Sequence, residues 1–243
     1  MNNHDNLKIS IITVCLNAAQ TIENAIISVI SQPYPNIEYI IIDGKSTDGT
    51  SDIINKYRDR ISVYVSEKDE GIYDAMNKGI GLATGDFIYF LGSDDILYPK
   101  AISEVTERLD RNLNAIYYGN VILSPSGKWF GGKFSKWRLI HKNITHQSIF
   151  YPSIVLKEDM FNCKYKLFAD WDLNLRLWSK HQNFIYIPVT IAKFHEGGRS
   201  YSLDSLFLKD QPRLIKKYFG ILPITYFFLF ISFPKKILNF LLS

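Results

Sequence analysis

The sequence predicts an α/β fold with a mostly parallel central sheet that is flanked by helices. Strand-like and helix-like segments alternate four times in the first hundred residues, which is typical of parallel strands connected by helices. The run from Phe87 to Leu91 is apolar throughout, as expected for a strand that is covered on both faces. With 243 residues and 47% apolar composition, the chain can build one large core, with a short appendage at most.

The first half is expected to alternate in a regular way. Its predicted strands are residues 8–15, 37–42, 61–65 and 86–91. A helix should begin near Thr21, because apolar residues then recur at helical spacing until Pro33. The turn at residues 43–49 is rich in helix-capping residues and precedes a short helix, and residues 71–83 are expected to form a longer one.

The second half is less regular. We expect a strand at residues 115–123, a turn at 124–127 and a return strand from Trp129. Residues 135–168 are aromatic and show no clear period, so they are predicted to be irregular. Residues 170–180 read as a helix with acidic side chains in its first turn.

Charge and cysteine content exclude several classes of protein. The net charge is +4, but residues 209–243 carry +5 and the remainder −1, which argues against a general nucleic-acid binder. Cys15 and Cys163 provide neither a disulfide framework nor a metal-binding spacing, as in proteins of a reducing compartment. The first residues lack the basic and apolar segments of a secretion signal, so we expect a cytoplasmic location.

Acidic residues follow two of the predicted strands. Asp94 and Asp95 come directly after the fourth strand and Gly92, and Asp43 ends the second strand. Ligands of open parallel sheets bind beyond the carboxyl ends of the strands. Adjacent carboxylates repel each other unless a proton or cation lies between them, so the pair favours a divalent metal that holds phosphates. A helix cap is the alternative, although it would explain only one of the two acids.

Other nucleotide-binding folds lack support in this sequence. There is no Gly-x-x-x-x-Gly-Lys-Ser/Thr loop, and the glycines at 79, 81 and 85 precede a strand instead of following one. A phospho-receiver domain would place acids after the first strand, where this chain has Leu16 and Asn17. The acidic motifs are therefore the remaining candidates for a nucleotide-binding site.

Five motifs occur in a recognisable order. They are Thr13-Val-Cys-Leu-Asn17, Asp43-Gly-Lys-Ser-Thr-Asp48, Asp69-Glu-Gly-Ile-Tyr-Asp74-Ala-Met-Asn77, Gly92-Ser-Asp94-Asp95 and Ala169-Asp170-Trp-Asp172. Together they resemble the family 2 glycosyltransferases with the GT-A fold, over roughly residues 8–200. Within that family, the chain is most similar to bacterial enzymes that build O-antigen, capsule and colanic-acid-type repeat units.

The resemblance implies a nucleotide-sugar site with a divalent metal, Mg²⁺ or Mn²⁺. In this reading Asp95 binds the metal and Asp94 supports the metal site and the nearby ribose. Asp43 would accept a hydrogen bond from the base, usually uracil, although Lys45 stands where the family more often has glycine. The further residues assigned to donor binding are Thr13, Asn17, Asp48, Asp74, Asn77 and Arg199. Asp48 has helix capping as an equal alternative.

The resemblance also implies a reaction that inverts the anomeric centre. Asp170 is then the general base and Asp172 the second choice, while the alternative is that both acids only offset the helix dipole. His146, Gln147 and Trp171 are assigned to the acceptor side. His195 is a candidate metal ligand.

The end of the chain is basic and apolar. Residues 218–233 are uncharged but short, and Gly220 and Pro223 interrupt them, so this stretch should lie in a membrane interface without crossing it. A dimer interface, or a helix folded back on the core, is the alternative. We therefore divide the chain into a catalytic domain at 1–208 and a membrane-associating tail at 209–243, the latter with an amphipathic helical character. Within the domain, residues 8–100 form the donor half and 101–208 the acceptor half.

The expected function is metal-dependent, inverting transfer of a sugar. The donor would be a nucleotide-diphosphate sugar, with UDP expected, and the acceptor a hydroxyl of a lipid-linked glycan in surface polysaccharide synthesis. The protein would lie at the inner face of the cell membrane. The rival interpretation is a catalytically inactive, membrane-attached protein of the same fold that binds sugar nucleotides.

Overall fold

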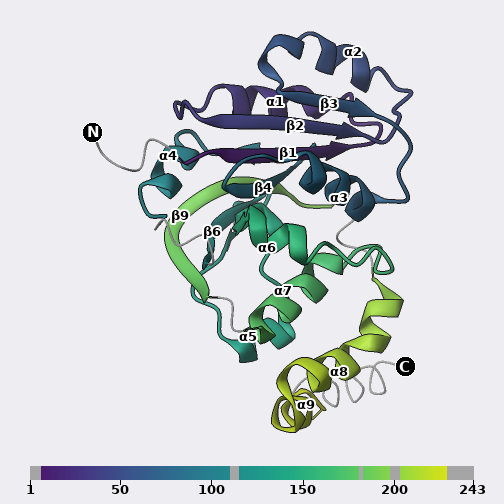
Figure 1. Cartoon of the computed structure of the whole chain (residues 1–243), viewed down its shortest axis with the longest axis vertical. Helices are drawn as coiled ribbons and strands as arrows, with labels where there is room; N and C mark the ends of the chain where they lie inside the picture. Colours follow the sequence, from purple (N-terminus) through teal and green to yellow (C-terminus); the bar gives the residue numbers. More distant parts are fainter. Residues whose placement is uncertain (1–6, 110–114, 181–182, 198–202, 229–243) are drawn as a thin grey trace.

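The computed structural model describes residues 7–109, 115–180, 183–197 and 203–228. One sheet runs through these residues in the strand order β3-β2-β1-β4-β8-β6-β9-β5, with β7 paired to β6 (Figure 1). The strands are β1 (Ile9–Cys15), β2 (Ile37–Asp43), β3 (Val63–Ser66), β4 (Phe87–Gly92), β5 (Ile96–Leu97), β6 (Ala115–Ser124), β7 (Trp129–Phe130), β8 (Ile149–Pro152) and β9 (Asn183–His195). The helices are α1 (Ile22–Ile30), α2 (Thr50–Asn55), α3 (Ile72–Leu82), α4 (Ala101–Thr106), α5 (Lys136–His141), α6 (Ser153–Glu158), α7 (Ala169–Ser179), α8 (Ser205–Phe219) and α9 (Ile221–Phe227), with 3-10 turns η1 (Arg58–Arg60) and η2 (His146–Ser148).

The first half of the sheet is parallel, as predicted. Strands β3, β2, β1 and β4 pair side by side in one direction. Their register aligns Cys15 with Asp43, Val14 with Gly92 and Asp43 with Ser66. The carboxyl ends of the four strands therefore meet at one edge of the sheet, where the loops with the acidic motifs begin.

The prediction of an irregular segment at residues 135–168 was wrong. This segment contains α5, η2, β8 and α6, and β8 lies between β4 and β6 in the middle of the sheet, antiparallel to both. Strand β8 has only four residues, too few to show a period in the sequence. The long strand β9 was also missed. It runs parallel to β6 with register shifts between Tyr118 and Val121.

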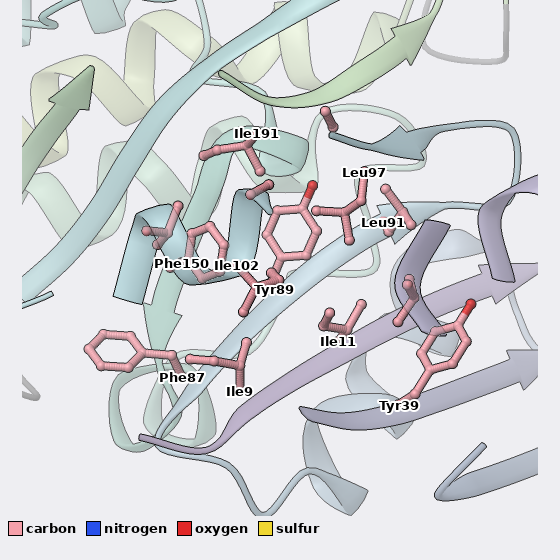
Figure 2. Close-up of a cluster of buried hydrophobic side chains, with 14 of the residues drawn as sticks. Ile9, Ile11, Tyr39, Phe87, Tyr89, Leu91, Leu97, Ile102, Phe150 and Ile191 are labelled. Carbon is pink, nitrogen blue, oxygen red and sulfur yellow. The ribbon is translucent and has the colours of Figure 1, made fainter. Parts of the chain in front are cut away.

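Alternating side chains of the strands divide the core into two layers. Ile9, Ile11 and Tyr89 face the layer that α1 and α4 cover, and Figure 2 shows this packing. Ile12 and Phe90, one position along the same strands, face the layer that α3, α6 and α7 cover. Successive strand residues point to opposite faces, so continuous apolar runs are required here. The predicted α/β class, with a mostly parallel sheet flanked by helices, is confirmed.

Helices α8 and α9 lie at the end of the molecule that is remote from β1–β3 (Figure 1). Phe207 and Leu214 of α8 belong to the core layer shared with α7, so the expected boundary at residue 208 falls inside a packed helix. Helix α9 folds back on α5, where Tyr226 packs against Trp137 at 4.9 Å between ring centroids. None of the helices in the described ranges has the length and apolar character to cross a membrane. Residues 229–243 of the expected tail lie outside the described residues.

Candidate active site

The loops that follow β1 and β2 are joined by hydrogen bonds. The backbone N–H of Asn17 donates to Ser46 Oγ at 2.8 Å, and Thr47 N–H donates to Asn17 Oδ1 at 2.9 Å. Asn17 has φ 53°, in the left-handed region that asparagine tolerates better than most residues. The two loops thus form one rigid platform at the carboxyl edge, with the exposed side chain of Asn17 at its surface.

Asp48 strengthens this platform and also accepts a hydrogen bond from the first residue of α2. Its Oδ2 accepts from Ala19 N–H at 3.0 Å, and its Oδ1 accepts from Thr50 N–H at 3.0 Å, where α2 begins. The hydrogen bonds from Thr50 and then Ala19 hold the pKa of this carboxyl below its usual value. The capping alternative for Asp48 therefore has a geometric basis, and donor contact stays a prediction.

Asp43 and Thr13 lie beneath the platform. Asp43 is fully buried, and it accepts from Ser46 N–H at 3.1 Å and from Ser66 Oγ at 2.6 Å. Thr13 is also fully buried and accepts from the hydroxyl of Tyr39 at 3.2 Å. Asp43 thus fixes the shape of the turn after β2, and the predicted hydrogen bond to a base stays a prediction.

Asp74 and Asn77 of α3 are engaged in contacts that brace the fold. Asp74 Oδ2 accepts from Glu70 N–H at 3.0 Å and lies 3.5 Å from Lys78 Nζ. The side-chain amide of Asn77 donates to Phe161 O and accepts from Phe161 N–H, both at 3.0 Å. Neither residue lines the cavities described below, so their predicted donor contacts remain untested.

Asp95 is buried between two elements that come from far along the chain. Its side chain accepts from His195 N–H of β9 at 2.8 Å on Oδ1 and from Gln147 Nε2 of η2 at 2.9 Å on Oδ2. Burial, and then the charge of Asp94, raises the pKa of Asp95 to about 6. A Cβ at Gly92 would meet Asp95 Oδ2 at 2.5 Å, which explains why glycine precedes the acidic pair.

The pair fits a divalent cation that substrate phosphates share. Among the described residues, no group of three or more His, Cys, Asp and Glu side chains is placed to hold a metal. Mg²⁺, however, is usually held by one or two carboxylates together with phosphates and water. Asp94 is exposed beside buried Asp95, and a cation would offset both the burial of the Asp95 carboxylate and its repulsion by Asp94, which raise the pKa of Asp95. The donor set therefore suits a metal that arrives with a diphosphate.

Of the predicted site residues His195 and Arg199, the structure describes only His195. His195 lines a cavity of about 190 Å³ together with Asp94, Lys193 and Asn24, which brings its side chain to the same region as the acidic pair. Its role as a metal ligand stays a prediction. Arg199 lies outside the described residues.

Asp170 belongs to a second carboxylate site, at the start of α7. Its Oδ1 accepts from Trp171 N–H at 2.8 Å, and the Tyr73 hydroxyl lies 3.1 Å from the same oxygen. Its Oδ2 lies 3.2 Å from His146 Nδ1 of η2. Desolvation by burial, and then the charge of Asp170, raises the pKa of Tyr73 well above its ordinary value, so the phenol stays protonated, and its shorter hydrogen bond donates to Leu167 O at 2.7 Å.

A cavity of about 440 Å³ opens beside Asp170. His146, Gln147 and Trp171, the three residues predicted for the acceptor side, all line it. The remaining lining residues are mostly aromatic or apolar, with two lysines: Gly71, Ile72, Tyr73, Phe130, Lys142, Asn143, Thr145, Lys166, Leu167, Phe168, Asp170 and Phe194. Phe130 and Phe194 gave no local signal in the sequence, because β7 and β9 bring them to the cavity.

Asp172, the second choice for the base, points elsewhere. Two residues along a helix correspond to a rotation of about 200°, so Asp170 and Asp172 lie on opposite faces of α7. Asp172 is 2% exposed, its Oδ2 is 3.8 Å from Arg176 Nε, and its Oδ1 has no hydrogen-bond partner. Burial raises the pKa of this carboxyl. Of the two acids, Asp170 alone lines the cavity.

Sequence comparisons place this geometry in a known context. The sequence model of the family described as Glycosyl transferase family 2 matches residues 10–168. A protein of Mycobacterium tuberculosis named PGL/p-HBAD biosynthesis glycosyltransferase is 36% identical over 213 residues, which cover 84% of this chain and 83% of that protein. The putative teichuronic acid biosynthesis glycosyltransferase TuaG of Bacillus subtilis is 42% identical over 90 residues, or 36% of each chain.

Solved structures share the fold. S. aureus TarS in complex with UDP-GlcNAc has a TM-score of 0.71 at 17% identity, over 87% of this chain and 65% of that one, so the chain spans just under two thirds of its length. The mannosyltransferase PcManGT from Pyrobaculum calidifontis, in complex with GDP-Man and Mn²⁺, has a TM-score of 0.62 at 18% identity, over 80% and 59%. At these identities the likeness concerns the fold.

Proposed function

The chain belongs to glycosyl transferase family 2 and is a glycosyltransferase, and from this premise we propose the reaction that its site performs. It transfers a sugar from a nucleotide-diphosphate donor to a hydroxyl of a lipid-linked glycan, with inversion, in the synthesis of a bacterial surface polysaccharide. UDP is the expected nucleotide. Named relatives in PGL/p-HBAD and teichuronic acid biosynthesis support the polysaccharide or glycolipid setting.

The observation that carries this proposal is the presence of two carboxylate sites next to each other. Asp94 and Asp95 follow β4 at the edge where the donor platform lies, and Asp170 lines the aromatic cavity. Adjacent residues of η2, Gln147 and His146, contact Asp95 and Asp170 respectively. An in-line displacement needs this division, with the leaving group on one side of the sugar and a base on the other.

Donor binding falls to the platform and the acidic pair. The Asn17 loop and the Asp48 loop would hold the nucleoside, and Asp94 with Asp95 would hold Mg²⁺ or Mn²⁺ together with the diphosphate. When bound, the cation supplies positive charge that stabilises the departing nucleotide diphosphate. A solved structure of similar fold that contains Mn²⁺ supports metal use.

Acceptor activation falls to Asp170. Its carboxylate accepts the proton of the acceptor hydroxyl as that oxygen bonds to the anomeric carbon and the bond from that carbon to the diphosphate breaks. Tyr73 and His146 contact the two carboxylate oxygens and hold them in one orientation. An acceptor that fills the aromatic-lined cavity would displace water, which would otherwise compete for the donor.

The lipid-linked nature of the acceptor is supported by the surface of α8 and α9. Four exposed cations, Lys209, Arg213, Lys216 and Lys217, recur at three- and four-residue spacing and so share one face of α8. On α9, Ile221 and Leu222 are 71% and 79% exposed. Basic and apolar side chains together suit the surface of an anionic membrane, where each cation contributes about 1 kcal/mol.

A donor panel tests the proposed function. Thermal unfolding is followed with UDP-, GDP- and dTDP-sugars, each with and without Mn²⁺, because a ligand that binds the native state raises the melting temperature. One donor class should stabilise the protein in a metal-dependent manner and should be slowly hydrolysed. Binding without hydrolysis or transfer would favour the inactive scaffold, and the absence of any binding would overturn the proposal.

A further inference from the structure

The 3-10 turn η2 contacts both carboxylate sites through adjacent side chains. Gln147 donates from Nε2 to Asp95 Oδ2 at 2.9 Å, and His146 Nδ1 lies 3.2 Å from Asp170 Oδ2. Gln147 is 4% exposed, so water could not replace Asp95 as the partner of its amide if this hydrogen bond broke. A buried polar group without a partner is costly, which favours a single arrangement of this side chain.

The direction of the Gln147 amide is set within the turn itself. The hydroxyl of Thr145 donates to Gln147 Oε1, so the N–H₂ end of the amide faces Asp95. The turn is fixed on two more sides, because Tyr89 OH donates to Gln147 O at 2.9 Å and Ser148 Oγ donates to Thr145 O at 2.8 Å. If the amide were rotated by half a turn, its carbonyl oxygen would face a carboxylate and repel it.

Asp95 is thereby held between two donors from distant parts of the chain. The N–H of His195 reaches one oxygen from β9, and Gln147 reaches the other from η2. Each carboxylate oxygen has two lone pairs, so one on each oxygen remains for a further ligand. The direction of these remaining lone pairs depends on the two donors.

We propose that Gln147 is a positioning residue that orients the Asp95 carboxylate toward its cation, and that Thr145 fixes the orientation of Gln147. The inference rests on the proposed function, because it presupposes a cation at Asp95. It also assigns Gln147, which was expected on the acceptor side, to the metal site. Since His146 belongs to the same turn, a displacement of η2 also disturbs Asp170. The turn η2 thus fixes the position of the donor carboxylate, Asp95, relative to the acceptor carboxylate, Asp170.

The test compares variants that keep the size of the side chain and change its hydrogen bonding. Gln147→Glu replaces the donor with a carboxylate that faces Asp95. Thr145→Val removes the hydroxyl but keeps the shape, and Thr145→Ser restores the hydroxyl. Mn²⁺ is titrated at fixed UDP, and separately at fixed GDP, with the melting temperature as the readout, and the ligand-free melting temperature is recorded for each variant.

The expected result is a loss of apparent Mn²⁺ affinity of about 10- to 100-fold for Gln147→Glu, because a hydrogen bond to a charged group is lost and a like charge is added. Thr145→Val should lose less, and Thr145→Ser should remain near wild type. Gln32→Glu is the matched control, since buried Gln32 bonds to Tyr98 O at 2.9 Å, far along the chain from η2. It should lower the ligand-free melting temperature without changing the affinity for Mn²⁺.

Wild-type Mn²⁺ affinity in Gln147→Glu would overturn the inference, and so would equal losses in Thr145→Ser and Thr145→Val. If the wild-type protein shows no Mn²⁺-dependent binding of UDP or GDP, the proposed metal-dependent donor site is contradicted, and this inference is contradicted with it. The two failures are therefore distinguishable, because the first leaves the wild-type titration intact.

Discussion

The donor half and the acceptor half of the molecule build their sites in different ways. In the donor half, the loops after β1 and β2 are stabilised largely by contacts between the two loops, such as Asn17 with Thr47 and Ala19 with Asp48. In the acceptor half, Asp170 depends on η2 and on Tyr73 of α3, which lies 97 residues away in the sequence. The nucleotide platform is therefore assembled by two loops at adjacent strand ends, whereas Asp170, like Asp95, is held by residues from distant parts of the chain.

This difference decides what each half contributes. A platform of hydrogen-bonded turns at parallel strand ends is suited to a nucleotide, whose shape varies little between donors. A cavity with walls from β7, β9, α3 and α7 can change with each of these elements. We therefore expect variants of the donor platform to alter donor affinity and variants of the cavity around Asp170 to alter transfer, while η2, which contacts Asp95, affects the metal site.

The largest expected effect tests the acceptor half. Asp170→Asn removes the proposed base but retains the shape of the side chain, so transfer should fall about 10²- to 10⁴-fold. Steady-state kinetics with a saturating donor measure this change, and donor affinity should remain within about twofold. Asp172→Asn is the matched control on the opposite face of α7, and equal losses in both variants would contradict the assignment of Asp170.

The next effect concerns the basic and apolar surface of α8 and α9, which follows the acceptor half in the chain and which we propose binds the membrane. Lys209→Glu with Lys216→Glu should weaken binding to vesicles containing anionic phospholipid by about 30-fold or more, because each lysine contributes about 1 kcal/mol. Co-sedimentation measures the change. Lys56→Glu with Lys128→Glu reverses two exposed charges elsewhere and should leave vesicle binding unchanged. Equal losses of vesicle binding in both double variants would indicate a general charge effect and would rule out α8 as the specific binding surface.

A smaller effect is expected in the donor half. Asn17→Ala loses the hydrogen bond from Thr47 N–H and places alanine at φ 53°. Donor affinity should fall about 5-fold, the value of one hydrogen bond, while the rate of transfer at saturation stays constant. Asn17→Gly keeps the backbone freedom and loses only the amide, so it separates the two causes. A loss of transfer rate at saturating donor would break the distinction between the halves.

The smallest effect is on stability and depends on pH. Asp172 has a raised pKa because of burial, so the folded state favours the protonated form and loses stability as pH rises through the folded pKa. Asp172→Asn should therefore be more stable than wild type at pH 7 by about 1 kcal/mol, because a charged oxygen without a partner is removed. The gain should vanish below about pH 4, where the unfolded carboxyl is also protonated.

Urea unfolding at several pH values measures this gain. Asp52→Asn, at an exposed position on α2, serves as the control and should show no such pH-dependent gain. A gain for Asp172→Asn that persists at low pH would contradict the electrostatic explanation.

The same contrast explains how much could be predicted from the sequence. The parallel strands of the donor half show long apolar runs, so their places along the chain and the acids at their ends were predicted from local pattern, whereas their order in the sheet was not. Strand β8, with four residues, has no detectable period, and its place between β4 and β6 depends on pairing across about 60 residues of chain. The family resemblance ranks Asp170 before Asp172, and the structure adds that, of the two, Asp170 alone lines the cavity.

The partners of Asp95 were beyond sequence reasoning for a similar reason. His195 contributes its backbone N–H, which carries no residue signature, and Gln147 contacts Asp95 from a turn 52 residues away. Local patterns identify which residues are acidic and where strands end. They do not identify which donors enclose an acid.

The central claim is that Asp95 and Asp170 have two separable roles in one sugar transfer, metal-supported donor binding and activation of the acceptor. Calorimetric titration of the stabilising donor in Mn²⁺ into wild type, Asp95→Asn and Asp170→Asn tests it most directly. The account predicts donor binding to wild type and Asp170→Asn with similar affinity, and loss of metal-supported binding in Asp95→Asn. Unchanged binding in Asp95→Asn, or its loss in Asp170→Asn, would contradict the claim.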